Sequence, residues 1–323
     1  MPADATPSQT IPVIDMGAWE HGTANDRAHI VQTIGDALVD LGFFAIENHG
    51  VDRAVIDRAY EVTGEFFALP GAEKLRWAIP DGAGQRGYTG FGREHAKDSQ
   101  APDLNEFWHV GRQFEPGDSA FAGMRLNVWP EGPDSFRPAL LRLYGALDQL
   151  AARLLEATSI YIDEPPTYLP STADRGDTIL RLIHYPPVPA DRHPASVRAA
   201  AHEDINLITI LCEATSGGLE LLQHDGSWRP IHALGGQLIV DSGDMIQHLT
   251  NGLLRSTTHR VVNPDNSRER RYSLPFFVHP RADVDLTPRA TCVRRTGGRE
   301  RYRALTAGQF LRQRLQEIGL ATD

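Results

Sequence analysis

Residues 201–212, AHEDINLITILC, place two polar side chains of the same parity just before an apolar run. His202 and Asp204 are two positions apart. Because alternate side chains of a β-strand point to the same face, both can enter one cavity while Glu203 points away. Leu207–Cys212 then reads as a buried strand. The stretch therefore predicts a strand end that opens into the mouth of a barrel.

Short apolar runs separated by turn signals continue on both sides of this stretch. Besides Leu207–Cys212, the predicted strands are Thr178–Tyr185, Leu219–Leu222, Gln237–Val240, Met245–Leu249, Thr258–Val262 and Tyr272–Val278. The pairs Asp225-Gly226 and Asn251-Gly252 are typical of tight hairpins. Many short strands with regular turns indicate a sandwich or a barrel, and a jelly roll is one way to close it.

The N-terminal third of the sequence predicts a mixed α/β portion. Its predicted elements are strands at Ile11–Asp15 and Phe43–Glu47 and helices at Asp26–Leu41 and Asp52–Phe67. Leucines repeating every three or four residues predict a long helix at Ser135–Ile162, and Thr306–Leu320 is predicted to be a terminal amphipathic helix. Residues 80–133 are rich in Gly, Pro and charge and predict a long loop with short strands.

Composition narrows the class of protein. The 323 residues carry a formal net charge of −10, which argues against partners that need a basic surface, such as nucleic acid or an anionic membrane. Cys212 and Cys292 both lie in apolar runs that read as strand, so we expect buried thiols. Met1–Thr10 lacks a signal pattern and no apolar run reaches membrane-spanning length. A reducing cytoplasm fits these features and suits a ferrous site.

His259 is the candidate third ligand of a metal held by His202 and Asp204. It lies in STTHRV (residues 256–261), and a jelly roll can bring such distant strands face to face. Two imidazoles and one carboxylate on one side of a metal are diagnostic of non-haem iron(II) oxygenases. On these residues alone, an equally good interpretation makes Asp204 a turn cap, His202 a surface residue and His259 a core histidine.

A second polar pair, Arg271 and Ser273, shares one parity in a later apolar strand. An arginine that faces a barrel interior is costly to bury unless a carboxylate meets it. A guanidinium beside a hydroxyl suits the distal carboxylate of a small dicarboxylic acid. The alternative is a surface arginine, since Arg268 and Arg270 lie close by.

Together these residues resemble the isopenicillin N synthase-like family of iron(II)/2-oxoglutarate dioxygenases. The resemblance covers nearly the whole chain and is specific in the order and spacing of its motifs. They are IPVID (11–15), GFFAIENHGV (42–51), HYPP (184–187), HED (202–204), GDM (243–245), TNG (250–252), STTHRV (256–261) and RYS (271–273).

The resemblance implies a fold, a cofactor set and a reaction. The fold is mainly β with flanking helices: a double-stranded β-helix (jelly-roll) core at 170–285, after an N-terminal portion at 1–130 and before a C-terminal strand and helix at 286–323, in one compact unit. His202, Asp204 and His259 take the iron(II) positions. The residues implied to hold 2-oxoglutarate are Arg271, Ser273 and Tyr185. With O2, such an enzyme hydroxylates a small molecule and releases succinate and CO2; desaturation and ring closure are variants.

Three other functions stay open. An oxidase of the same fold can use the triad without 2-oxoglutarate, and succinate release separates the two. A zinc hydrolase could use two histidines and a carboxylate, although the sequence lacks H-E-x-x-H. A non-catalytic ligand-binding jelly roll is the third.

The substrate contacts are expected from the long loop and from the strand after Arg271. The loop candidates are Arg86, Tyr88, Phe91, Arg93, Glu106, Trp108 and His109, and the strand adds Phe277 and His279. Surface or core packing is an equally good interpretation for each of them singly. His49 is expected to serve a turn, and His184 and His248 to be packed and hydrogen-bonded. Substrate identity and oligomeric state are not readable from the residues.

Overall fold

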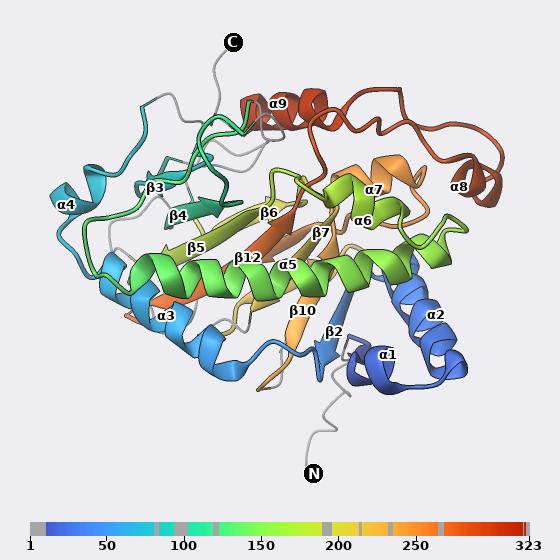
Figure 1. Ribbon diagram of the computed structural model, residues 1–323, viewed down its shortest axis with the longest axis horizontal. Helices are drawn as coiled ribbons and strands as arrows, with labels where there is room; N and C mark the ends of the chain where they lie inside the picture. The colour runs from blue at the N-terminus through green and yellow to red at the C-terminus, as the bar shows by residue number, and fades with distance from the viewer. Residues whose placement is uncertain are drawn as a thin grey trace.

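Two β-sheets form the centre of the molecule (Figure 1). The computed structural model describes residues 11–80, 84–93, 103–118, 123–188, 196–212, 215–231, 235–263, 268–318 and 320. The larger sheet consists, in spatial order, of β1 (Val13–Asp15), β2 (Phe43–Glu47), β10 (Leu238–Ser242), β7 (Ile208–Cys212), β12 (Arg271–Val278), β5 (Ile179–Tyr185), β4 (Glu106–Gly111) and β3 (Gly87–Thr89). The smaller sheet consists of β6 (Ala199–His202), β11 (His259–Val261), β8 (Leu219–Leu222) and β9 (Trp228–Pro230).

From β5 to β12 the chain alternates between the two sheets. Strands β5, β7, β10 and β12 belong to the larger sheet, and β6, the β8–β9 hairpin and β11 belong to the smaller one. The neighbouring strands of this part pair antiparallel. This winding is the double-stranded β-helix that the resemblance implied, and the Asp225-Gly226 turn joins β8 to β9 as expected.

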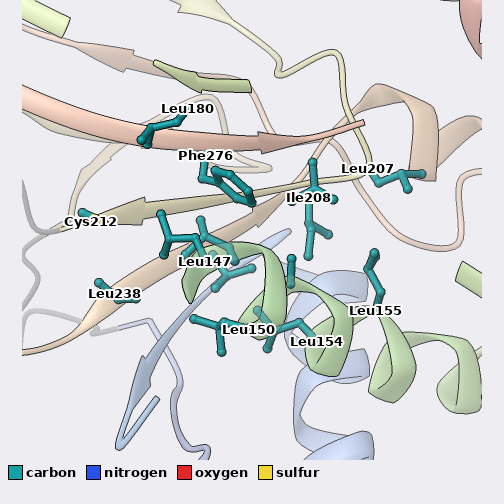
Figure 2. Packing of buried hydrophobic residues seen from close by; sticks show 14 of the residues in the cluster. Leu147, Leu150, Leu154, Leu155, Leu180, Leu207, Ile208, Cys212, Leu238 and Phe276 are labelled. Carbon is teal, nitrogen blue, oxygen red and sulfur yellow. The ribbon is translucent and has the colours of Figure 1, made fainter. Parts of the chain in front are cut away.

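The strands of the larger sheet separate apolar from polar side chains because successive residues point to opposite faces. On the outer face, the long helix α5 (Phe136–Tyr161) runs across the sheet (Figure 1). Its leucines, including Leu147, Leu150 and Leu154, pack against Leu180, Ile208 and Phe276 (Figure 2). The opposite face of the same strands lines a cavity between the two sheets.

Eight further helices flank the sheets in the described part of the chain. They are α1 (Gly17–His21), α2 (Ala24–Asp40), α3 (Arg53–Phe67), α4 (Gly71–Leu75), α6 (Tyr168–Ala173), α7 (Asp244–Leu249), α8 (Ala290–Arg295) and α9 (Ala307–Glu317). Helices α2 and α9 both begin with a capping box, in which the Thr23 or Thr306 hydroxyl accepts from the third residue of the helix. None of the described helices combines the length and the apolar character that crossing a bilayer requires.

Four predictions of local structure were wrong. Met245–Leu249 is the helix α7 and not a strand, and Asn251-Gly252 ends that helix with left-handed φ angles of 57° and 75° instead of turning a hairpin. Cys292 lies on helix α8, although its thiol is buried as expected, and the residues described after it form no strand. An apolar run of five or six residues does not by itself distinguish a strand from a short buried helix.

Apolar side chains fill one end of the space between the sheets. Phe43, Leu219, Leu221 and Ile239 form a buried cluster there with neighbouring residues. A larger apolar cluster lies outside the barrel and draws on all three parts of the chain, from Ile14 to Ala307. The interior is therefore solid at one end and hollow at the other, where the polar residues collect.

Candidate active site

Three side chains from two adjacent strands and a turn converge at the hollow end of the barrel. His202 ends β6, and His259 begins β11 directly opposite it in the antiparallel register. The ligand atoms of His202, Asp204 and His259, here called the triad, all lie within 4.8 Å of one another. Asp204 Oδ1 is 3.7 Å from Nε2 of each histidine. Asp204 lies in the turn after β6, so convergence depends on this turn as well as on strand parity.

Hydrogen bonds orient each of these groups toward a common point. His202 Nδ1 donates to the Ala200 carbonyl at 2.7 Å, and His259 Nδ1 lies 3.1 Å from the Thr257 carbonyl, where it can donate in the same way. Each ring therefore keeps the lone pair of Nε2 for a ligand. The Thr209 hydroxyl donates to Asp204 Oδ2, which leaves Oδ1 facing the histidines. Partners that fix the ring tautomer in this way are typical of metal-binding histidines.

The charge states also suit a cation. Burial acts to raise the pKa of Asp204, but His259, His202 and the Thr209 hydroxyl outweigh it and lower that pKa. Burial, with His202 next, lowers the pKa of His259. An ionised carboxylate and a neutral imidazole are the forms that bind metals. In the described part of the chain this is the one group of three or more His, Cys, Asp or Glu residues that converges in this way.

Asp241 on β10 is a neighbouring acid that sequence reasoning missed. Burial and the adjacent Asp204 carboxylate raise the pKa of Asp241 well above its ordinary range. Asp241 lines the same cavity as the triad. Glu203, expected to point away, accepts a hydrogen bond from the Thr258 hydroxyl at the rim of the same cavity.

The residues predicted to hold 2-oxoglutarate, two from strand parity and Tyr185 from the resemblance, also meet in the cavity. Arg271, Ser273 and Tyr185 are 2–3% exposed and line it together, with Arg271 opposite Tyr185 across β12 and β5. The Arg271 guanidinium carbon is 4.9 Å from the centre of the Tyr185 ring, and Nε donates to the Ser216 carbonyl. Among the described residues no hydrogen-bond partner meets Arg271 Nη1, although that atom is buried.

A second buried arginine, Arg198, lies behind this group. Its side chain is fully buried, and its guanidinium carbon is 5.9 Å from the centre of the same Tyr185 ring. Its Nη2 donates to the Glu269 carbonyl, and within the described chain its Nε and Nη1 have no hydrogen-bond partner. Burial, followed by the nearby Arg271, lowers the pKa of Arg198. Two buried guanidinium groups therefore lie close together, Arg271 in the cavity lining and Arg198 behind it, and an anion at Arg271 would stabilise both.

The cavity has a volume of about 240 Å³ and joins these groups to the triad. Its walls come from the inner faces of the two sheets and from α9. Side chains that line it and were missed from the sequence are Gln85, Asp103, Asn105, Arg181, Leu311, Arg314, Leu315 and Ile318. Arg181 could have been found, because it shares the parity of Tyr185 on the predicted strand. The α9 residues had no such signal, since nothing local in the sequence says which strand end a terminal helix covers.

Of the predicted substrate contacts, His109, Phe277 and His279 line the cavity. The others lie elsewhere. Arg86 pairs with Asp177 at 2.6 Å, and Trp108 packs against Phe66 and Phe136 on the outer face. Phe91 and Arg93 are exposed and do not line the cavity. The parity of β4 explains Trp108: its neighbour His109 faces the cavity, so Trp108 faces outward.

Tyr88 and Glu106 belong to a separate buried cluster. Lys74 Nζ lies 2.7 and 2.8 Å from the two Glu106 oxygens, and His184 Nδ1 donates to Glu106 Oε1 at 2.8 Å. The Tyr88 hydroxyl also donates to Glu106. We refer to Lys74, Tyr88, Glu106 and His184 as the Glu106 cluster. It lies outside the cavity lining.

The expected structural histidines are packed as predicted. His49 Nδ1 accepts from the Val51 amide within its turn, and His248 Nε2 donates to the Arg303 carbonyl. The His184 ring lies against the rings of Phe67 and Tyr272, with centroid distances of 5.3 and 5.0 Å.

Comparison with known families finds two matches. Residues 11–132 match the family described as "non-haem dioxygenase in morphine synthesis N-terminal", and residues 176–280 match the 2OG-Fe(II) oxygenase superfamily. A 2-oxoglutarate-Fe(II) type oxidoreductase of Aspergillus fumigatus is 30% identical over 280 residues, which cover 84% of this chain and 82% of that protein.

Solved structures agree with these matches. A protein of Caulobacter crescentus assigned to the 2OG-Fe(II) oxygenase family is 39% identical, with a TM-score of 0.84 over 95% of this chain and 98% of that one. A full-length Neurospora crassa protein, solved in complex with alpha-KG and thymine, is 26% identical, with a TM-score of 0.85 over 97% of this chain and 98% of that one.

Proposed function

This chain belongs to the 2OG-Fe(II) oxygenase superfamily, and on that premise we propose that it hydroxylates a small molecule at an iron held by His202, Asp204 and His259. The protein is an oxidoreductase, a 2-oxoglutarate- and iron(II)-dependent dioxygenase. Its reaction consumes O2 and 2-oxoglutarate and releases succinate and CO2. Hydroxylation and the roles of individual residues are the proposal.

The observation that carries the iron assignment is the converged triad with both Nε2 atoms and Asp204 Oδ1 turned to one point. Two imidazoles and a carboxylate fit iron(II) and leave coordination positions open. When bound, iron supplies the redox chemistry that activates O2 with electrons from 2-oxoglutarate. The protein's share is to hold the Nδ1 protons of both rings on backbone carbonyls, so that each ring keeps one orientation.

The distal carboxylate of 2-oxoglutarate is assigned to Arg271 and Ser273. A buried Arg271 Nη1 that meets no partner in the described residues supports this assignment, because a buried N–H is costly unless an acceptor reaches it. Ser273 follows on the same face of β12, where its hydroxyl can donate to the same carboxylate. Tyr185 packs its ring against the guanidinium and holds it in place.

A small substrate is supported by the size of the cavity. Its volume of about 240 Å³ lies below the roughly 300–1,000 Å³ typical of drug-sized pockets, and it must also admit 2-oxoglutarate. We place the reaction in the cytoplasm, because the free buried thiols of Cys212 and Cys292 and a ferrous centre both fit reducing conditions. Cell fractionation tests this location.

Succinate release under ferrous iron and ascorbate tests the proposed function. The purified protein should convert 2-oxoglutarate to succinate slowly without a substrate and faster with members of a metabolite library. A hydroxylated product, 16 mass units heavier than its precursor, should form in equal amount to the additional succinate. O2 consumption without succinate would instead assign the triad to an oxidase, and turnover with zinc alone to a hydrolase.

A further inference from the structure

The cavity contains a second cationic position, Arg181, on the inner face of β5. Its guanidinium carbon lies 4.2 Å from the centre of the Phe107 ring and 5.3 Å from that of Phe277. Its Nε donates to His109 Nε2 at 2.5 Å. Two aromatic rings and a hydrogen bond therefore hold this guanidinium in one orientation, which lowers the entropy lost when it binds a ligand.

Arg181 lies apart from the arginine assigned to 2-oxoglutarate. In the register of β5 and β12, Tyr185 is opposite Arg271 and Ile179 is opposite Phe277. Arg181 is four residues from Tyr185, a separation of about 13 Å along a strand. The larger sheet thus presents two guanidinium groups to the cavity, from positions about 13 Å apart along the strands, and we assign the distal carboxylate to Arg271 alone.

The groups around Arg181 complete a site for one anionic group. Burial is the main cause that lowers the pKa of both His109 and His279, so both rings are neutral. His279 Nδ1 is 3.2 Å from the Phe277 carbonyl and donates to it, which leaves Nε2 as an acceptor. Of these three groups Arg181 is the fixed cation, and its charge also acts on Asp204.

The wall that α9 contributes to the same cavity carries three apolar side chains beside Arg314 and Glu317. Leu311, Leu315 and Ile318 line it from α9 and the residue that follows that helix. Arg314 Nη2 lies 2.6 Å from Asp244 and so ties α9 to α7. A ligand held at Arg181 would therefore have its remaining surface against hydrocarbon side chains, where an aliphatic or aromatic body is favoured.

We propose that the substrate is a small monocarboxylic acid with an apolar body, whose carboxylate binds Arg181 while its hydrocarbon part packs beneath α9. The proposal rests on the proposed function and names the substrate class of the same site. In the reaction, one atom of O2 enters a C–H bond of the acid to give the hydroxy acid, and the other enters succinate. 2-Oxoglutarate loses CO2, and the acid and 2-oxoglutarate each supply two of the four electrons that O2 takes up.

Binding without turnover tests the proposal. The iron-loaded protein is titrated under anaerobic conditions, with 2-oxoglutarate present, with hexanoate, octanoate and 3-phenylpropanoate and with the primary amide of each. Calorimetry should give each bound acid a Kd at least tenfold lower than that of its amide. A tenfold difference in Kd corresponds to about 1.4 kcal/mol of binding free energy. Arg181→Gln should remove this preference, and Arg181→Lys should restore part of it. The matched control is Arg58→Gln, on the exposed face of α3, which should keep it.

Two results would overturn the proposal. One is a wild-type protein that binds no acid of the panel more tightly than its amide. The other is Arg181→Gln weakening 2-oxoglutarate itself, titrated alone, by the same factor as the acids, because Arg181 would then serve the near carboxylate of 2-oxoglutarate. Failure of the proposed function is distinct: it is the absence of 2-oxoglutarate-dependent succinate release, which requires no acid.

Discussion

In the described part of the chain we compare two buried groups that combine histidine with a carboxylate, the triad, which lines the cavity between the sheets, and the Glu106 cluster, which does not. The triad joins two imidazoles to Asp204, with no lysine or arginine among its members. The Glu106 cluster joins His184 to a carboxylate that also meets Lys74 and the Tyr88 hydroxyl. Both carboxylates are about equally buried, with 7% of each side chain exposed. Burial therefore does not distinguish the functional group from the structural one.

The difference lies in what neutralises each carboxylate. Glu106 meets a protonated amine within the fold and accepts three further hydrogen-bond contacts, so its charge is balanced by the protein itself. Among the described residues, Asp204 meets the Thr209 hydroxyl, the neighbouring Asp241 carboxyl and two imidazoles whose lone pairs point the same way. No lysine or arginine of that part of the chain forms an ion pair with it, so a cation from outside would complete the group. A buried group of histidines and a carboxylate can therefore bind a metal ion when its lone pairs converge and no lysine or arginine of the fold already neutralises the carboxylate.

Replacing one histidine in each group should separate the two roles most strongly. His259→Ala should lower iron affinity by more than about 100-fold, beyond the 10–100-fold typical of losing a partner of a ligand, and should abolish succinate release. The matched variant His184→Ala should keep iron affinity and lower the melting temperature instead. Iron titration and calorimetric melting of both variants measure this. Unchanged iron affinity in His259→Ala would remove that residue from the metal site.

Neutralising the carboxylate of the Glu106 cluster should cost stability rather than binding. Glu106→Gln leaves Lys74 buried without a counter-charge, and breaking such a pair destabilises a fold by about 3–5 kcal/mol. Urea unfolding measures the loss. The control is Glu61→Gln, which breaks the exposed pair with Arg58 and should cost at most about 1 kcal/mol. Equal losses in the two variants would mean that the Glu106 cluster is not a buried ion pair in solution.

Replacing Arg271, the residue assigned to the distal carboxylate, should weaken the binding of 2-oxoglutarate. Arg271→Ala should raise the KM for 2-oxoglutarate by roughly 10- to 100-fold, since a hydrogen bond to a charged group contributes about 1.5–3 kcal/mol. Arg260→Ala is the matched control, because Arg260 lies beside His259 on β11 but pairs with Glu220 and does not line the cavity. An equal KM for 2-oxoglutarate in Arg271→Ala and wild type would contradict the anchor role.

Strand parity, which is local, pointed to the pairs His202 and Asp204 and Arg271 and Ser273, and the resemblance to a known family favoured the metal-site interpretation over the alternatives and added Tyr185. His202, Arg271 and Ser273 needed only the rule that alternate residues share a face, and the repeated short strands pointed to the barrel that brings His259 to them. The face on which the β4 residues lie could not be predicted, because it depends on a distant part of the chain. Glu106 and Trp108 lie on one side of β4 and His109 on the other, and which side faces the cavity depends on how β4 pairs with β5, about 70 residues later in the chain.

Helix α7 and the arginines show two further limits. The run Met245–Leu249 is too short for its period to separate helix from strand, and Gly252 suits a helix end as well as a hairpin. Arg198 precedes a strand of only four residues, and nothing local marks its side chain as fully buried. Its burial follows from the distant residues Tyr185 and Arg271 packing over it.

Acid should weaken the Glu106 cluster in a defined pH window. Burial alone would raise the pKa of Glu106, but hydrogen bonds from His184, Lys74 and Tyr88 outweigh burial and lower that pKa below the ordinary value of 4.5. A lowered pKa in the folded state stabilises the fold above the unfolded pKa, and this contribution is lost as the pH falls through the folded one. The stability gap between wild type and Glu106→Gln should therefore narrow below pH 4.5, by at most about 1.4 kcal/mol per pH unit. Urea unfolding of both proteins between pH 6 and pH 3 measures the gap, and parallel curves would show that no cation in the cluster holds Glu106 ionised.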